Sequence, residues 1–195
     1  MPELDYKQIL GAITVLMIIV GYGKYMIDTW KGKTTPHLFS WIIFFPLGVI
    51  SFLIQYNDGA GPGAWGTAGG FVTAGIIVVL SLKQGEKNIT KTDTISFVLG
   101  LCAVGLYIFV SNPVYALVLL IIINVFAFYP TFRKTYHKPN EETLLAYVLA
   151  GIRSSISIGA MANYSFLTLA MPIFIVMVNI AFVTLVLVRK KQLNK

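Results

Sequence analysis

Seven apolar runs, each about as long as a membrane-spanning helix, take up most of the sequence. A helix needs about 20 mostly apolar residues to cross the hydrocarbon core of a bilayer. The runs occupy residues 9–28, 37–56, 64–83, 94–110, 113–131, 143–162 and 166–188. They lack the alternation of apolar and polar residues that is typical of membrane barrel strands. We therefore predict an all-α integral membrane protein with seven transmembrane helices in a single membrane domain, residues 1–195.

Composition favours the same class of protein. Hydrophobic residues make up 56% of the chain and charged residues only 12%, whereas roughly a quarter of the residues of a soluble domain are charged. The net charge of +7 lies in short connectors and not on one amphipathic face. We expect a lipid bilayer as a partner and no nucleic acid. The single cysteine, Cys102, excludes an intramolecular disulfide framework.

The basic residues predict how the chain is oriented in the membrane. Short loops rich in Lys and Arg stay on the cytoplasmic side. Thirteen of the 15 basic residues lie in or beside alternate connectors and in the tail: Lys24, Lys31, Lys33, Lys83, Lys87, Lys91, Arg133, Lys134, Lys138, Arg189, Lys190, Lys191 and Lys195. We predict an outside N-terminus and a cytoplasmic C-terminus, and we expect a bacterial inner membrane.

The order of apolar runs and connectors repeats at a shift of 106 residues. The shift places Ser51 on Ser157 and continues without a gap, although only seven of 75 aligned pairs are identical. The run at 94–110 has no counterpart, and one extra helix is what a three-helix unit needs before it can repeat in the same orientation. We predict two parallel three-helix repeats, 9–83 and 113–189, joined by an inversion-linker helix and related by an axis along the membrane normal.

The segment Phe128-Tyr129-Pro130-Thr131, followed by a basic connector, resembles a known signature. Members of the SWEET and PQ-loop superfamily carry a Pro-Gln pair near the cytoplasmic end of the first helix of each repeat. Here Thr131 replaces the Gln, and the first copy has Lys24-Tyr25 with no proline. The resemblance covers nearly the whole chain. It implies a 3+1+3 helix plan and an outside N-terminus, but not sugar as the substrate. We expect a permease for a small polar solute, anionic or sugar-like.

Arg153 is the sharpest functional signal, because it lies near the middle of the sixth run. A central Arg costs about 2.5–3.5 kcal/mol on insertion scales, while the seven Leu, Ile and Val residues of that run return roughly 2–4 kcal/mol at about 0.3–0.6 each. We therefore expect Arg153 to face protein or a wet cavity. Two interpretations are open: an anion-binding or gating residue, or a structural Arg that bonds to carbonyl groups.

Other polar residues and prolines at membrane depth are candidates for a solute pathway. The second run carries a stripe at helical spacing, formed by Ser40, Phe44, Gly48, Ser51 and Gln55. With Arg153, the candidate substrate-binding residues are Ser51, Gln55, Trp65, Thr73, Asn124, Ser157 and Asn179. The candidate hinges are Pro46, Pro130 and Pro172. Close helix packing, cross-helix hydrogen bonding and static kinks are the alternative interpretations.

The remaining aromatic and histidine residues are interpreted as parts of the surface. Trp30, Trp41, Tyr136 and Tyr147 are assigned to the aromatic belt at the interface, and His37 and His137 to the cytoplasmic surface. The glycine-rich stretch at 57–64 is predicted to form a tight surface turn. No metal-ligand spacing, catalytic motif or phosphate-binding loop occurs in the sequence, so we expect no metal, no cofactor and no enzymatic activity.

Two classes of function follow. One is a transporter that moves a small-molecule solute by alternating access between the two repeats. The other is a non-transporting receptor or assembly partner on the same scaffold, similar to the KDEL receptors. Access separates these classes, since a transporter opens its cavity to each side in turn. The sequence leaves a homo-oligomer open.

Overall fold

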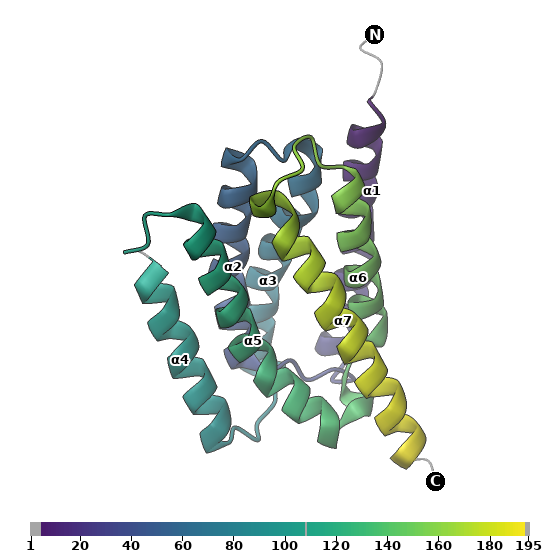
Figure 1. Ribbon diagram of the computed structural model, residues 1–195. Coiled ribbons are helices and arrows are strands. Elements are labelled where there is room, and N and C mark those ends of the chain that lie inside the picture. The colour runs from purple at the N-terminus through teal and green to yellow at the C-terminus, as the bar shows by residue number, and fades with distance from the viewer. Residues whose placement is uncertain (1–4, 108, 194–195) are drawn as a thin grey trace.

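The computed structural model describes residues 5–107 and 109–193, and it is helical throughout, with no strand in those ranges. The α-helices are α1 (Tyr6–Trp30), α2 (Leu38–Asn57), α3 (Trp65–Gln84), α4 (Lys91–Tyr107), α5 (Pro113–His137), α6 (Leu144–Gly159) and α7 (Phe166–Leu193). Two short 3-10 helices, η1 (Gly61–Ala64) and η2 (Pro139–Glu141), precede α3 and α6. Consecutive helices run in alternate directions, so the two termini lie at opposite ends of the bundle (Figure 1). The all-α prediction is confirmed.

Five of the seven helices are long and apolar enough to cross a membrane. They are α1, α2, α3 together with η1, α5 and α7, at 20 to 28 residues each. In contrast, α4 has 17 residues and α6 has 16, which is shorter than the usual span of about 20. The chain is thus a helical membrane protein, and the prediction of seven spans exceeds the number that length and composition support.

The helix boundaries follow local signals but differ from the apolar runs. Helix α5 begins at Pro113, where a missing backbone N–H is harmless, and Asn112 caps it by accepting a hydrogen bond from the Val114 N–H at 2.9 Å. The same helix continues to His137, beyond the predicted end at 131, and its last turns carry polar residues that the apolar run did not include. Helix α4 ends at Tyr107, whereas the predicted run reached 110, and residue 108 of that run lies outside the described residues.

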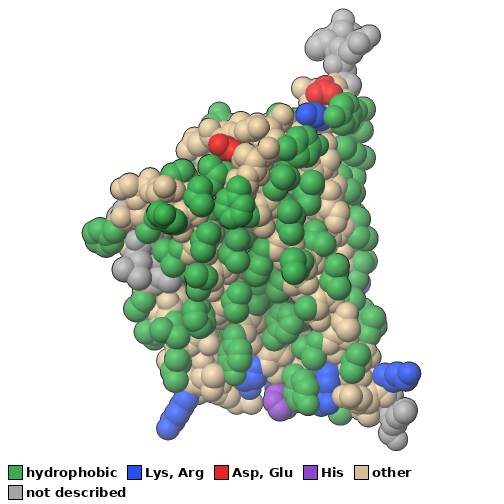
Figure 2. Space-filling view, viewed as in Figure 1, with side chains coloured by type: hydrophobic (Ala, Val, Ile, Leu, Met, Phe, Trp, Pro, Cys, Tyr) green, Lys and Arg blue, Asp and Glu red, His purple; other side chains and the backbone are tan. Residues whose placement is uncertain are grey.

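The helices pack as two groups of three. Helix α3 lies between α1 and α2, and α7 lies between α5 and α6. The groups meet mainly where α1 packs on α6 and α2 packs on α5, while α4 packs at one side against α5 and α2 (Figure 1). Hydrophobic side chains cover the middle of the visible surface, and Lys and Arg gather at the end that carries the C-terminus (Figure 2). We call this end, with connectors 31–37, 85–90 and 138–143, the basic end.

A buried ion pair lies at the basic end, and its lysine also bonds to the other group of helices. Lys134 of α5 is almost completely buried, and its ammonium group lies 2.6 Å from a carboxylate oxygen of Glu142. The same ammonium donates to the Thr35 carbonyl at 2.7 Å and to the Glu141 carbonyl at 2.9 Å. Tyr147 donates to the other Glu142 oxygen at 3.1 Å. Both charges are therefore hydrogen-bonded, as buried charges must be if they are not to destabilise the fold.

His37 does not lie on the surface, so this part of the sequence interpretation is wrong. Its side chain is fully buried, with Nε2 3.5 Å from the Asp93 carboxylate. Burial lowers the pKa of His37, although the Asp93 carboxylate opposes this shift. Arg133 forms a two-pronged contact with the same carboxylate, from Nε at 2.8 Å and from Nη2 at 2.7 Å. The connector at 31–37 turns inward because the first turn of α4, which carries Asp93, faces it.

At the opposite end, the predicted surface turn is present only in part of the stretch at 57–64. Asp58 and Gly59 form a turn, but Gly61–Ala64 form η1, in which Gly63 and Ala64 are buried, and Ala60 and Ala64 pack with Met161 in a small apolar cluster. Gly59 and Gly61 have φ angles of 75° and 58°, a conformation that glycine adopts without strain. The Ala162 N–H donates to the Ala60 carbonyl at 2.9 Å and so joins the two groups of helices at this end.

The buried pair generates a stability prediction. Lys134→Met keeps most of the side-chain volume but leaves Glu142 buried without its partner, so we expect a loss of about 3–5 kcal/mol in the free energy of unfolding. The measurement is SDS-induced unfolding in mixed micelles. Lys87→Met serves as a control, since Lys87 is exposed, and should change stability by less than about 0.5 kcal/mol. An equal, small effect of both changes would show that the pair does not hold this end together.

Candidate functional site

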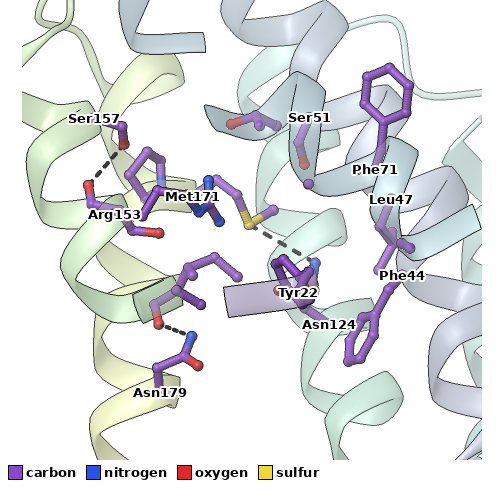
Figure 3. A pocket seen from close by; sticks show the side chains of 18 of the residues that line it. Tyr22, Phe44, Leu47, Ser51, Phe71, Asn124, Arg153, Ser157, Met171 and Asn179 are labelled. Carbon is purple, nitrogen blue, oxygen red and sulfur yellow. Dashed lines mark hydrogen bonds between the residues drawn. The ribbon is translucent and has the colours of Figure 1, made fainter. Parts of the chain in front are cut away.

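A central cavity of about 130 Å³ lies between the two groups of helices. Six helices line it, all except α4, and this volume accommodates several water molecules or a small solute. Figure 3 shows Arg153, Ser157 and Asn179 on one side of the space, with Phe44, Ser51 and Phe71 on the other. The lining residues are Tyr22, Trp41, Phe44, Leu47, Gly48, Ser51, Gln55, Thr67, Gly70, Phe71, Ala74, Asn124, Phe128, Tyr147, Ala150, Arg153, Ser154, Ser157, Met171, Pro172, Ile175 and Asn179.

Arg153 reaches the cavity from the predicted face of α6. Ala146, Ala150 and Ser157 recur at helical spacing from it and are buried with it, so this face of the helix turns away from lipid. A Cβ atom on Gly66 of α3 would lie 2.8 Å from Arg153 Nη1, closer than real Cβ contacts come. The absence of a side chain at Gly66 therefore makes room for the guanidinium group.

The guanidinium of Arg153 has no partner among the residues that the structure describes. Its Nε is buried without a hydrogen bond, and no carboxylate in the described ranges forms an ion pair with it. An uncompensated buried charge is expensive, and an arginine side chain is not deprotonated in proteins. Arg153 is also the one charged side chain among the described lining residues. The cavity consequently presents one unbalanced positive charge.

The polar stripe of α2 faces the cavity as expected for four of its five members. Phe44, Gly48, Ser51 and Gln55 line it, whereas Ser40 lies nearer the basic end and accepts a hydrogen bond from Thr131 at 2.9 Å. Thr67 of α3 donates to Gln55 Oε1 at 3.0 Å, which leaves Gln55 Nε2 buried without an acceptor.

Asn124 and Asn179 bring amides to the cavity from α5 and α7. Asn124 Nδ2 donates to the Leu120 carbonyl at 2.9 Å, and Asn179 Nδ2 donates to the Ile175 carbonyl at 2.8 Å. Each donor is thus used within its own helix. Asn179 Oδ1 is left buried without a donor.

Two predicted site residues lie elsewhere. Thr73 is buried but donates to the Gly69 and Gly70 carbonyls of its own helix, and Trp65 is 40% exposed at the start of α3; neither lines the cavity. The three candidate hinge prolines all lie inside helices: Pro46 in α2, Pro130 in α5 and Pro172 in α7. Among them, Pro172 lines the cavity.

Sequence analysis did not predict the aromatic wall of the cavity, which consists of Tyr22, Trp41, Phe44, Phe71, Phe128 and Tyr147. Trp41 and Tyr147, which were assigned to the interfacial belt, are buried and line the cavity, while Trp30 is 72% exposed. Tyr25 packs between them, with ring centroids 5.5 Å from Trp41 and 6.3 Å from Tyr147. These rings form a layer between the cavity and the buried Lys134 at the basic end. The shift of 106 residues, which pairs Trp41 with Tyr147, was the signal that could have found them.

No group of three His, Cys, Asp or Glu side chains in the described part of the chain is arranged to hold a metal ion. Comparison with family models, curated proteins and solved structures gave no match to this chain. The cavity is therefore the feature from which a function has to be inferred.

The unpaired charge generates a second prediction. Arg153→Met should leave the melting temperature of the protein in detergent unchanged or raise it by a few degrees, because it removes a desolvated charge that no described group compensates. Leu120→Ala is the comparison variant, since Leu120 is fully buried outside the cavity and its truncation should cost about 2–5 kcal/mol. A fall with Arg153→Met as large as that with Leu120→Ala would assign Arg153 a structural role.

Proposed function

We propose that the protein is a transporter that moves a small polar solute by alternating access between two three-helix repeats. The observation that carries the proposal is the central cavity, in which a buried and unpaired arginine lies between helices of both repeats. Ionisable residues inside a membrane span are rare, and they mark solute or ion pathways. Substrate sites of repeat-built transporters lie between the repeats near the membrane midplane.

Helix packing supports the repeats. The shift of 106 residues carries α1, α2 and α3 onto α5, α6 and α7. Under this exchange the contact of α1 with α6 becomes the contact of α5 with α2, and both contacts are present. The position of α3 between α1 and α2 matches that of α7 between α5 and α6. Helix α4 has no counterpart and joins the repeats, which agrees with its role as inversion linker.

Contacts between equivalent residues favour a two-fold axis along the membrane normal. Residues that lie close to such an axis also lie close to the equivalent residues of the other repeat. At the basic end, Thr35 donates to Glu141 at 2.6 Å, and these two residues are 106 apart. At the opposite end, Asn163 donates to the Asp58 carbonyl at 2.9 Å, and these residues are 105 apart. An axis through both ends runs parallel to the helices and relates the repeats in the same orientation.

The cavity wall obeys the same relation. Six pairs of lining residues are separated by 106: Tyr22 and Phe128, Trp41 and Tyr147, Phe44 and Ala150, Leu47 and Arg153, Gly48 and Ser154, and Ser51 and Ser157. The wall is therefore built from equivalent positions that differ in chemistry. In particular, Leu47 occupies in the first repeat the place that Arg153 has in the second.

The resemblance to the SWEET and PQ-loop superfamily agrees with this plan. Under the proposal all seven helices span the membrane, with the shorter α4 and α6 close to the lower limit of about 17 residues. The basic end lies in the cytoplasm because it carries the short Lys- and Arg-rich connectors. The Pro130-Thr131 pair stands in the buried part of α5 near that end.

Access to the cavity from each side tests transport without a known solute. Ser157→Cys in a Cys102→Ser background places one thiol in the cavity. We expect a small water-soluble, membrane-impermeant thiol reagent to label it both from outside and from inside, in right-side-out and inverted vesicles, because the cavity opens to each side in turn. Ile122→Cys is the control: Ile122 is 47% exposed on α5 outside the cavity and should stay unlabelled as a lipid-facing residue.

Labelling of Ser157→Cys from a single side would contradict transport and would favour a receptor on the same scaffold. Labelling of Ile122→Cys would show instead that the reagent enters the lipid-facing surface.

A separate labelling experiment tests orientation. Lys33→Cys and Gln192→Cys lie at the basic end, so in intact cells an impermeant reagent should miss both, while Ser111→Cys at the opposite end should react. The reverse pattern would contradict the predicted topology but would leave the packing of the helices unaffected.

A further inference from the structure

The charge of the central cavity restricts what can occupy it. Arg153 contributes one positive charge, and the described lining residues include no carboxylate. In a poorly solvated site, an occupant with one negative charge compensates the guanidinium. A neutral occupant leaves the charge unpaired, and a dianion brings a second charge that no described lining residue neutralises.

The form of the guanidinium restricts the anion further. The planar fork of arginine matches a carboxylate, which accepts two parallel hydrogen bonds. Arg153 lines the cavity and makes no hydrogen bond or ion pair with the described residues, so its guanidinium group can take a carboxylate there. A phosphate monoester carries between about −1.5 and −2 charges at neutral pH, more than one arginine balances. The geometry therefore favours a monocarboxylate.

The rest of the wall restricts the body of the solute. Six of the lining residues are aromatic: Tyr22, Trp41, Phe44, Phe71, Phe128 and Tyr147. Several polar groups are already used within the protein, such as the Ser157 hydroxyl, which donates to the Ser154 carbonyl at 2.8 Å. The lining atoms that remain buried without a partner are Arg153 Nε, Gln55 Nε2 and Asn179 Oδ1. A flat apolar body packs well against the six rings of the wall.

We propose that the central cavity binds a small monocarboxylate with a flat, largely apolar body, its carboxylate on the guanidinium of Arg153. The inference rests on the proposed function, because it names the class of solute for the same cavity. The aromatic wall holds its body by stacking and by exclusion of water.

The test uses the full chain in lipid nanodiscs and two probes of the same shape, benzoate and its neutral amide, benzamide. Isothermal titration should give an affinity for benzoate about tenfold or more above that for benzamide, since a charge-assisted pair of hydrogen bonds is lost with the amide. The dianion phthalate should bind more weakly than benzoate. Glucose should not compete with benzoate.

Variants separate the charge from the rest of the cavity. Arg153→Met should bind benzoate no better than benzamide, and Arg153→Lys should keep part of the preference, because an ammonium lacks the planar fork. Arg189→Met removes an exposed arginine outside the cavity and should bind benzoate as the parent does. Thermal unfolding of each variant checks that it is folded.

Three results would overturn the inference. They are equal binding of benzoate and benzamide by the parent, unchanged benzoate binding by Arg153→Met, and the absence of benzoate binding up to roughly 10 mM. None of these depends on vesicle labelling, so the class of solute can fail while alternating access stands. Conversely, single-sided labelling of Ser157→Cys would reject transport even if benzoate binds as expected.

Discussion

A guanidinium group held inside an apolar bundle is the constraint around which the centre of this protein is arranged. Removing such a group from water costs several kcal/mol unless something compensates it. The bundle leaves space for Arg153 at Gly66, and small residues surround it on its own helix. The charge is nevertheless unpaired among the described residues. A bundle selected for stability alone would be better served by an apolar residue, such as Leu47, which lines the same cavity 106 residues earlier in the chain.

The interface between the two groups of helices, here called the seam, contains the cavity and the contacts that close it at each end. At the basic end, Lys134 bonds to Thr35 across the seam, and the rings of Trp41 and Tyr147 lie between this contact and the cavity. At the opposite end, Ala60 and Ala162 join the same two groups through one backbone hydrogen bond. Movement of one group against the other therefore has to break a different set of contacts at each end, which is the physical requirement for alternating access.

The sequence predicted the helices and one polar side of the cavity but not its aromatic wall. The orientation of Arg153 and Ser51 could be predicted, because a charge or a polar stripe on an otherwise apolar helix has to face away from lipid. Thr73 lies in a helix that is apolar around most of its circumference, so the direction of its side chain could not be predicted from the sequence. The burial of His37 depends on Asp93, which is 56 residues away, and on how two connectors fold together. Trp41 was misplaced because aromatic residues suit an interface and a cavity wall equally well.

The most direct measurement is the NMR signal of the Arg153 Nε–H group. The chain has three arginines, Arg133, Arg153 and Arg189, so a spectrum of the protein labelled with ¹⁵N-arginine is simple, and Arg153→Lys identifies the signal of interest. If Arg153 binds the carboxylate of the solute, benzoate should move its Nε–H proton downfield and leave the other two signals in place. Benzamide should have little effect. An Arg153 signal that benzoate does not move, or that both probes move equally, would contradict the account.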